Sequence, residues 1–229
     1  MAVAADQPTA EVPRAVTQEI DDRRLGIVGA GKFGTTLARA AVAAGYDVAI
    51  SGSGSADAIA LTIDVLARGA HPATTDEVVR HADVIVLAIP THRFRELQPD
   101  LFAGKILIDA TNYWPPVDGD DPELAEAPEG TSAIVQQHFP SARLVKSLNQ
   151  LGYHQLEVNQ QPHGAPNRIA IGAAGDDQLA VRTAMRLLDH LGFDPVDAGP
   201  LKNGVALEPD GSPIATTYNA EQLAKRISR

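Results

Sequence analysis

The residues whose types and spacing suggest chemistry most directly are three glycines, Gly29, Gly31 and Gly34. Their spacing, G-x-G-x-x-G, is that of a loop that places backbone N–H groups against a diphosphate. We expect Gly29 to allow a tight turn, Gly31 to let the diphosphate approach the backbone, and Gly34 to let a helix pack closely. The N-terminus of that helix would add a partial positive charge that favours phosphate.

The neighbouring elements favour a binding loop over a glycine turn used only for packing, which is the alternative interpretation. An apolar run at residues 25–30 ends at the loop, and residues 32–45 follow with apolar side chains at helical spacing. A strand, a glycine loop and a helix within about 30 residues form the context that a dinucleotide-binding motif requires. We therefore expect a dinucleotide here.

The end of the second expected strand, at Ser51, bears on the choice between NAD and NADP. NAD-binding proteins of this type carry an Asp or Glu about 20 residues after the first glycine. Its carboxylate accepts a hydrogen bond from the ribose 2′-OH. Here that position is Ser51, and no carboxylate follows until Asp57. The hydroxyls and exposed amides of residues 51–55 offer a nest for a 2′-phosphate instead. We favour NADP, although the first downstream arginine, Arg68, is far along the next helix.

Three later strand ends offer polar groups but no acid–base pair. They are residues 88–92 (AIPTH), 110–112 (ATN) and 147–150 (SLNQ). The pocket of a doubly wound sheet lies beyond such carboxyl ends, so these groups could orient a nicotinamide or a second ring system. No catalytic residue is predicted. This pattern suits hydride passage between two redox cofactors, for which the protein supplies position and excludes water.

The side chains that could donate a proton or bind a metal each have a plainer interpretation. His92 is either a proton donor or a surface or capping histidine. Lys146 and Asn149 are expected on opposite faces of a strand, because side chains alternate, which argues against a catalytic Lys/Asn pair. The seven histidines lack metal-ligand spacing and cysteine is absent, so no metal site is expected.

Short apolar runs alternate with helical patterns along most of the chain. Continuous apolar strands separated by helices predict an α/β fold with a Rossmann-type, doubly wound, mostly parallel sheet and a small C-terminal extension. The expected strands are residues 25–30, 46–51, 82–90, 105–112, 142–149, 168–174 and 193–199. The expected helices are residues 32–45, 57–68, 75–81, 131–138, 176–191 and 216–228.

We expect a disordered tail (residues 1–22), a dinucleotide-binding domain (23–150) and a C-terminal portion (151–229) that continues the sheet and ends in a helix. Residues 113–130 are rich in Pro, Asp and Glu, and this composition predicts a long surface loop. Its acids, Asp118, Asp120 and Asp121, lack the pattern of a calcium-binding loop and are expected to be solvated.

Composition limits the partners. With 229 residues, 44% of them hydrophobic and 21% charged, the chain can bury a substantial core. The formal net charge of −10 argues against nucleic acid or an anionic membrane as a partner. No apolar run approaches the roughly 20 residues of a membrane span, and the first residues do not read as a secretory signal. We expect a cytoplasmic protein.

Together these motifs resemble the coenzyme F420-dependent NADP oxidoreductases. The similarity runs from about residue 24 to residue 201 and includes the glycine motif, ADVIVLAIP, IDATNYW, LVKSLNQLG and GFDPVDAGPL. The resemblance implies hydride transfer between NADPH and the deazaflavin ring of F420 or a related flavin-like molecule, often in a homodimer. The same domain type also occurs in membrane-bound metalloreductases, which pass electrons from NADPH through a flavin.

The resemblance also implies which residues contact the cofactors. The pyrophosphate would lie against Gly29, Ala30, Gly31, Lys32, Phe33 and Gly34. The 2′-phosphate would meet Ser51, Gly52 and Ser53, where Gly52 occupies the place of an arginine that family members usually carry. Ile89 and Pro90 would flank the nicotinamide, and Asn149 and Gln150 would lie near the deazaflavin. At the same strand ends, Ala88, His92 and Asn112 are further candidates for cofactor contact.

Two other functions are compatible with the residues. A dehydrogenase or imine reductase acting directly on a small carbonyl or imine would need a proton donor, with His92 or Lys146 as candidates. A regulatory protein that binds NAD(P) without turnover would need no acid–base pair.

Overall fold

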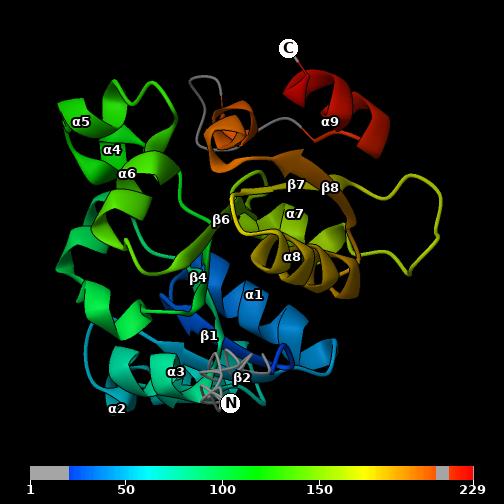
Figure 1. Cartoon of the computed structure of the whole chain (residues 1–229). Coiled ribbons are helices and arrows are strands. Elements are labelled where there is room, and N and C mark those ends of the chain that lie inside the picture. The colour runs from blue at the N-terminus through cyan, green and yellow to red at the C-terminus, as the bar shows by residue number, and fades with distance from the viewer. Residues whose placement is uncertain (1–20, 210–216, 229) are drawn as a thin grey trace, which may run out of the picture.

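The computed structural model describes residues 21–209 and 217–228. The predicted tail, residues 1–22, lies outside these residues except for its last two. Figure 1 shows an extended sheet with helices on both sides, from β1 and β2 near one end to β7 and β8 at the other. Over these two stretches, none of the helices combines the length and the apolar composition needed to cross a bilayer.

Within the described residues, eight strands form one sheet in the order β3-β2-β1-β4-β5-β6-β7-β8. Neighbouring strands are parallel except β6 and β7, which are antiparallel. The first six strands follow the order of the Rossmann dinucleotide-binding fold, so the predicted fold class is confirmed. The strands are β1 (Arg24–Val28), β2 (Asp47–Ser51), β3 (His71–Ala73), β4 (Val84–Leu87), β5 (Ile106–Asp109), β6 (Arg143–Ser147), β7 (Ala170–Gly175) and β8 (Asp194–Gly199).

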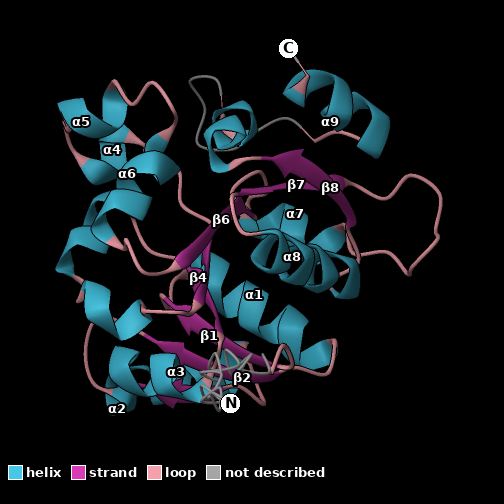
Figure 2. Cartoon of the chain, viewed as in Figure 1, coloured by secondary structure: helices cyan, strands magenta, loops and turns pink. Residues whose placement is uncertain are grey.

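Helices cover both faces of the sheet (Figure 2). One core cluster lies under α1, α2, α7 and α8, and a second lies under α3, α5, α6, η1 and η2. The α-helices are α1 (Lys32–Ala43), α2 (Ala56–Leu66), α3 (Thr75–His81), α4 (Pro115–Asp118), α5 (Pro122–Ala125), α6 (Thr131–His138), α7 (Tyr153–Val158), α8 (Gln178–His190) and α9 (Ala220–Ile227). The 3₁₀ helices are η1 (Thr91–Glu96), η2 (Pro99–Phe102) and η3 (Leu201–Leu207).

Strand β4 shows why a continuous apolar run becomes a central strand. All four of its residues are buried. Val84 and Val86 belong to the cluster on the α1 side, whereas Ile85 and Leu87 belong to the cluster on the α3 side. Alternation along the strand therefore sends apolar side chains into both cores, as a sheet covered on both faces requires.

Seven elements of the described residues have no counterpart among the predicted ones, namely β3, α4, α5, α7, η1, η2 and η3. Strand β3 contains only three residues, one of them Pro72, and it lies at the edge of the sheet, where proline is tolerated. Helix α7 and the 3₁₀ helix η3 fall in segments that carry no clear apolar period. Local pattern is weakest for such short elements, because tertiary packing rather than propensity holds them.

The prediction of a solvated loop at residues 113–130 is wrong for Asp118. Helices α4 and α5 order this segment, and the Asp118 side chain is only 1% exposed. Its carboxylate accepts hydrogen bonds from the His92 backbone N–H (3.1 Å), from the His92 ring and from the Trp114 N–H (2.8 Å). A buried carboxylate needs such partners, and two of the three come from His92 in η1, which lies 26 positions earlier in the sequence.

The sheet continues through the C-terminal portion. Strands β7 and β8 extend it beyond β6, and α9 packs over them in a small third cluster that includes Leu207 and Leu223. The predicted C-terminal helix, residues 216–228, is present as α9 within the described residues. This portion places η3 beside the end of β6, close to the predicted deazaflavin side of the molecule.

Candidate functional site

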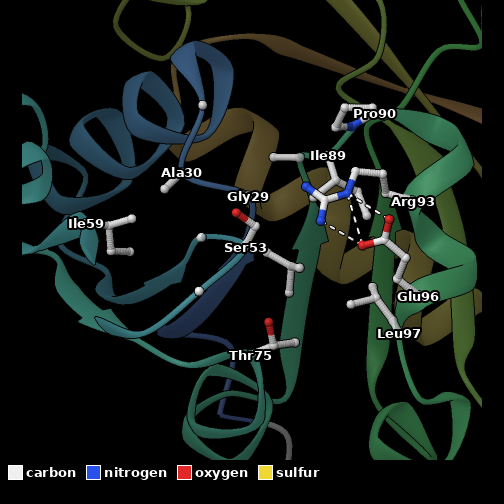
Figure 3. A pocket seen from close by; sticks show the side chains of 15 residues that line it. Gly29, Ala30, Ser53, Ile59, Thr75, Ile89, Pro90, Arg93, Glu96 and Leu97 are labelled. Carbon is white, nitrogen blue, oxygen red and sulfur yellow. Dashed lines mark hydrogen bonds and ion pairs between the residues drawn. The ribbon is translucent and has the colours of Figure 1, made fainter. Parts of the chain in front are cut away.

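A cavity of about 520 Å³ opens where β1, β2 and β4 end (Figure 3). Its walls come from the glycine loop, the turn after β2, the first residues of α3 and the segment that follows β4. The lining residues are Val28, Gly29, Ala30, Gly31, Gly52, Ser53, Gly54, Ile59, Thr75, Ala88, Ile89, Pro90, Arg93, Glu96 and Leu97. Carboxyl ends of parallel strands on either side of the β1–β4 switch are where doubly wound sheets bind ligands.

The first glycine makes the turn at the floor of this cavity. Gly29 has φ +124°, which favours glycine, and a Cβ there would lie 2.2 Å from the Ala88 carbonyl oxygen. Its N–H donates to the Ser51 carbonyl at 2.8 Å. The turn therefore touches both β2 and β4, and no larger residue fits.

Gly31 differs from its neighbours because the space beside it is open. It is the N-cap of α1 with φ −77°, and a Cβ there would meet no atom within 4 Å. No side chain caps this helix, so its first N–H groups are not bonded to a side-chain acceptor. A helix N-terminus of this kind, facing a cavity through a bare glycine, is suited to a diphosphate.

Gly34 has the packing role predicted for it. A Cβ at this position would lie 1.8 Å from the Gly29 carbonyl oxygen, so α1 could not sit so close to the turn with any other residue. Of the other loop residues, Ala30 lines the cavity. Lys32 instead places its ammonium 5.4 Å from the centre of the Tyr153 ring, and Phe33 packs against the core.

The turn after β2 corrects one predicted contact. Ser51 was expected at the 2′-phosphate, but it is fully buried, and its hydroxyl lies 3.2 Å from that of Thr75. As the last residue of β2, it pairs with Val28 on one side and with Ala73 on the other. The residues that reach the cavity from this turn are Gly52, Ser53 and Gly54.

Of the residues predicted to contact a cofactor after β4, some line the cavity and one does not. Ala88, Ile89 and Pro90 line the cavity, whereas His92 does not. The His92 ring bonds Asp118 at 2.9 Å, which agrees with a surface or capping histidine. This interaction ties η1 to α4. A contact between His92 and a cofactor stays a prediction.

Two charged cavity residues, Arg93 and Glu96, were missed by sequence reasoning. Both extend from η1, and their side chains form an ion pair with an Nη2–Oε2 distance of 2.7 Å. The Glu96 hydrogen bonds raise the pKa of Arg93, and the same bonds lower the pKa of Glu96, so both groups are charged at neutral pH. The R-x-x-E spacing just after a strand end was the available signal.

The residues predicted near a deazaflavin form a separate group at the ends of β5 and β6. Asn112 donates to the Asn149 carbonyl (2.6 Å), and the Asn149 amide donates to the Asn112 side chain (3.0 Å) and to the Leu207 carbonyl (2.9 Å). The Gln150 side chain accepts from the Gly172 N–H at 2.7 Å. Asn149 and Gln150 are buried, and contact with a second cofactor stays a prediction.

The prediction that Lys146 and Asn149 lie on opposite faces assumed that the strand continues to Asn149, and this assumption is wrong. The strand ends at Ser147, and Leu148 has φ +66°, so alternation does not extend to Asn149. The Lys146 ammonium bonds the Thr111 carbonyl at 2.7 Å, next to the Asn112 that pairs with Asn149. Lys146 is nevertheless fully buried, which separates it from a substrate in the cavity.

A buried carboxylate, Asp109, accompanies Lys146. Burial alone raises the pKa of Asp109, but the Lys146 charge and hydrogen bonds from Ser132 and Thr111 outweigh it and hold the pKa below its usual value. The two charged groups are 3.3 Å apart. Across the described part of the chain, no group of three or more His, Asp or Glu side chains is arranged to hold a metal ion.

Comparison with known proteins gives a family match in the first part of the described chain. Residues 24–113 match the family described as coenzyme F420-dependent NADP oxidoreductase, which confirms the resemblance seen in the motifs. The similarity to this family of NADP oxidoreductases therefore covers less than half of the chain. The match ends shortly after β5, so it contains the glycine loop, the turn after β2 and η1.

The matches to curated relatives cover only part of each relative. Metalloreductase STEAP3 from Rattus norvegicus is 26% identical over 208 residues, which are 90% of this chain and 38% of the relative. The protein YjhV from Escherichia coli is 37% identical over 54 residues, 24% of this chain and 39% of the relative. The matched residues thus span well under half the length of both relatives.

Solved structures share the fold. A hypothetical protein from Sinorhizobium meliloti is 25% identical with a TM-score of 0.71, over 85% of this chain and 94% of the other. A provisionally assigned F420-dependent NADP reductase from Arthrobacter sp. is 24% identical with a TM-score of 0.66, over 78% and 86% of the two chains. An imine reductase from Pseudomonas sp. is 16% identical with a TM-score of 0.53, over 90% and 60%.

Proposed function

We propose that this chain, whose residues 24–113 match the F420-dependent NADP oxidoreductases, transfers hydride between NADPH and F420 or a related flavin-like molecule. The observation that carries the proposal is the open space beside Gly31 at the uncapped N-terminus of α1. A larger side chain at position 31 would fill that space, whereas glycine leaves it open for a diphosphate.

The dinucleotide would lie across the carboxyl ends of the strands. The diphosphate would accept hydrogen bonds from the N-terminus of α1 beside Gly31, and the adenosine half would enter the cavity bounded by Gly52–Gly54 and η1. The nicotinamide half would then extend past Ile89 toward the ends of β5 and β6. In this arrangement residues 23–150 bind NADP(H) and residues 151–229 form the boundary on the acceptor side.

The protein's share of the reaction would be placement rather than proton transfer. Among the described residues that line the cavity, the ionisable side chains are Arg93 and Glu96, and they pair with each other. NADPH and the acceptor supply the hydride chemistry when bound. Hydride passage between two ring systems needs close, parallel rings and exclusion of water, which apolar wall residues such as Ile89 and Leu97 favour. The homodimer and the cytoplasmic location stay predictions.

Turnover with a panel of acceptors tests this function. NADPH oxidation would be followed with F420, with FMN, and with a set of small carbonyls and cyclic imines. We expect reduction of F420 or the flavin and none of the carbonyls, because the described residues that line the cavity include no unpaired acid to protonate them. Turnover with a carbonyl or imine alone would favour a dehydrogenase or imine reductase. Binding of NADPH without any turnover would favour a regulatory protein.

A further inference from the structure

We infer that Arg93 is the residue that selects NADP over NAD by binding the 2′-phosphate of the adenosine half, an inference that rests on the proposed dinucleotide function. Among the described side chains that line the cavity, Arg93 is the one cation. At the position after β2 where the resemblance implies an arginine, this chain has Gly52. The charge would thus come from the segment after β4 rather than from the turn after β2.

The position of Arg93 matches the place of the 2′-phosphate. The ribose of the adenosine lies at the end of the second strand in Rossmann folds. Here that wall of the cavity is Gly52, Ser53 and Gly54. Figure 3 shows the Arg93 side chain extending from η1 into the cavity toward the side on which Ser53 lies. A phosphate between the two walls could accept from the guanidinium, from the Ser53 hydroxyl and from the backbone N–H groups of the turn.

The turn after β2 cannot readily supply the arginine itself. A Cβ on Gly52 would lie 2.7 Å from Cγ2 of Ile59, a residue of α2 that also lines the cavity. A long side chain at that position would therefore displace Ile59 and narrow the adenosine pocket. Glycine keeps the backbone N–H groups exposed, which leaves the cation to come from the opposite wall.

Glu96 holds the Arg93 guanidinium in place. Its carboxylate accepts from Nε at 3.1 Å and from Nη2 at 2.7 Å. The remaining nitrogen, Nη1, has no hydrogen-bond partner among the described residues, and the side chain is 34% exposed, so a donor is free to meet a ligand. Because the planar guanidinium group of Arg93 is already held by Glu96, less side-chain entropy is lost when phosphate binds. Glu96 is thus a positioning residue, although its negative charge weakens the attraction for phosphate.

Binding measurements with paired ligands test the assignment. Calorimetry would compare NADP⁺ with NAD⁺, and adenosine 2′,5′-bisphosphate with AMP, for the wild type and the variants Arg93→Ala, Arg93→Lys and Glu96→Gln. We expect Arg93→Ala to weaken both 2′-phosphorylated ligands by about 10- to 100-fold and to change NAD⁺ and AMP by less than about threefold. Arg93→Lys should lose less affinity than Arg93→Ala, because lysine keeps the positive charge but lacks the planar guanidinium with its several N–H donors.

Glu96→Gln separates charge from position. Glutamine keeps a carbonyl oxygen that accepts from the guanidinium but removes the negative charge, so the affinity for NADP⁺ should rise by about two- to fivefold. The matched control is Arg95→Ala on the same 3₁₀ helix. Arg95 bonds Asp121 and Glu123 rather than the cavity, and its removal should leave all four affinities unchanged.

Several results would overturn the inference. One is an equal loss of NADP⁺ and NAD⁺ in Arg93→Ala, which would place Arg93 at the adenine or the diphosphate. Another is a selective loss of NAD⁺ in Glu96→Gln, which would make Glu96 an acceptor for the ribose 2′-OH. A wild-type protein that prefers NAD⁺ would also overturn it while leaving the dinucleotide function intact. Failure of every nucleotide to bind the wild type would instead refute the proposed function.

Discussion

Gly31→Val is expected to abolish NADP binding while the protein stays folded. Gly31 has an ordinary φ of −77°, and a Cβ there meets no protein atom within 4 Å, so valine fits the chain without strain. Its methyl groups would occupy the space where the diphosphate approaches the N-terminus of α1. Loss of two or more charge-assisted hydrogen bonds, at about 1.5–3 kcal/mol each, corresponds to an affinity loss of at least about 100-fold.

Calorimetry and thermal unfolding would check the two halves of this expectation separately. Titration with NADP⁺ should show no binding to Gly31→Val, whereas its unfolding temperature without ligand should equal that of the wild type within a degree or two. Gly34→Val is the matched control, because a Cβ there lies 1.8 Å from the Gly29 carbonyl. That variant should lose stability before it loses the site. Normal NADP⁺ affinity in Gly31→Val would remove the assignment of the glycine loop.

The contrast between these glycines shows what a local motif can predict. Gly29, Gly31 and Gly34 lie within one strand, turn and helix, so their roles follow from spacing and need no knowledge of the rest of the fold. The central strands are equally local: four consecutive apolar residues in β4 are buried on two faces, as the run predicts. The strand order, by contrast, depends on long-range pairing, which general rules for α/β folds make predictable in outline.

The rest of the site depends on contacts between distant segments. Arg93 reaches the cavity because η1 follows β4, and no pattern near Gly52 points to a residue 41 positions later. Ser51 has the expected place at a strand end, yet the pairing of β2 with β3 and the contact with Thr75 bury its side chain. Leu148, a non-glycine residue with φ +66°, ends an alternation that the sequence alone would continue.

Replacing Lys146 with methionine is expected to destabilise the fold by about 3–5 kcal/mol, because it leaves the buried Asp109 carboxylate without its cation. Both side chains are fully buried, and the Lys146 ammonium lies 3.3 Å from Asp109 Oδ2 and 2.7 Å from the Thr111 carbonyl. Methionine fills a similar volume, so loss of packing contributes little. The free energy of unfolding, measured by urea denaturation at neutral pH, would give the size of the effect.

A double variant separates the charge from the packing. Asp109→Asn in the Lys146→Met background removes the unpaired charge, and we expect it to restore at least half of the lost stability. Asparagine still accepts from the Thr111 N–H and hydroxyl, which bond Asp109 in the wild type at 3.0 and 2.7 Å. If the double variant were no more stable than Lys146→Met, the loss would come from packing, from the freed Thr111 carbonyl or from Glu208, whose carboxylate lies 3.8 Å from the Lys146 ammonium.

The pH dependence of these variants follows from the sign of the Asp109 shift. In the wild type the pKa of Asp109 is below its ordinary value, so the carboxylate stabilises the folded state above the unfolded pKa of about 3.9 and loses that effect as the pH falls. Without Lys146, burial raises the pKa of Asp109, and the charged form destabilises the folded state at neutral pH. The stability difference between wild type and Lys146→Met should therefore shrink as the pH falls from 7 toward 4. A difference that stays constant over this range would show that Asp109 is not the group left unpaired.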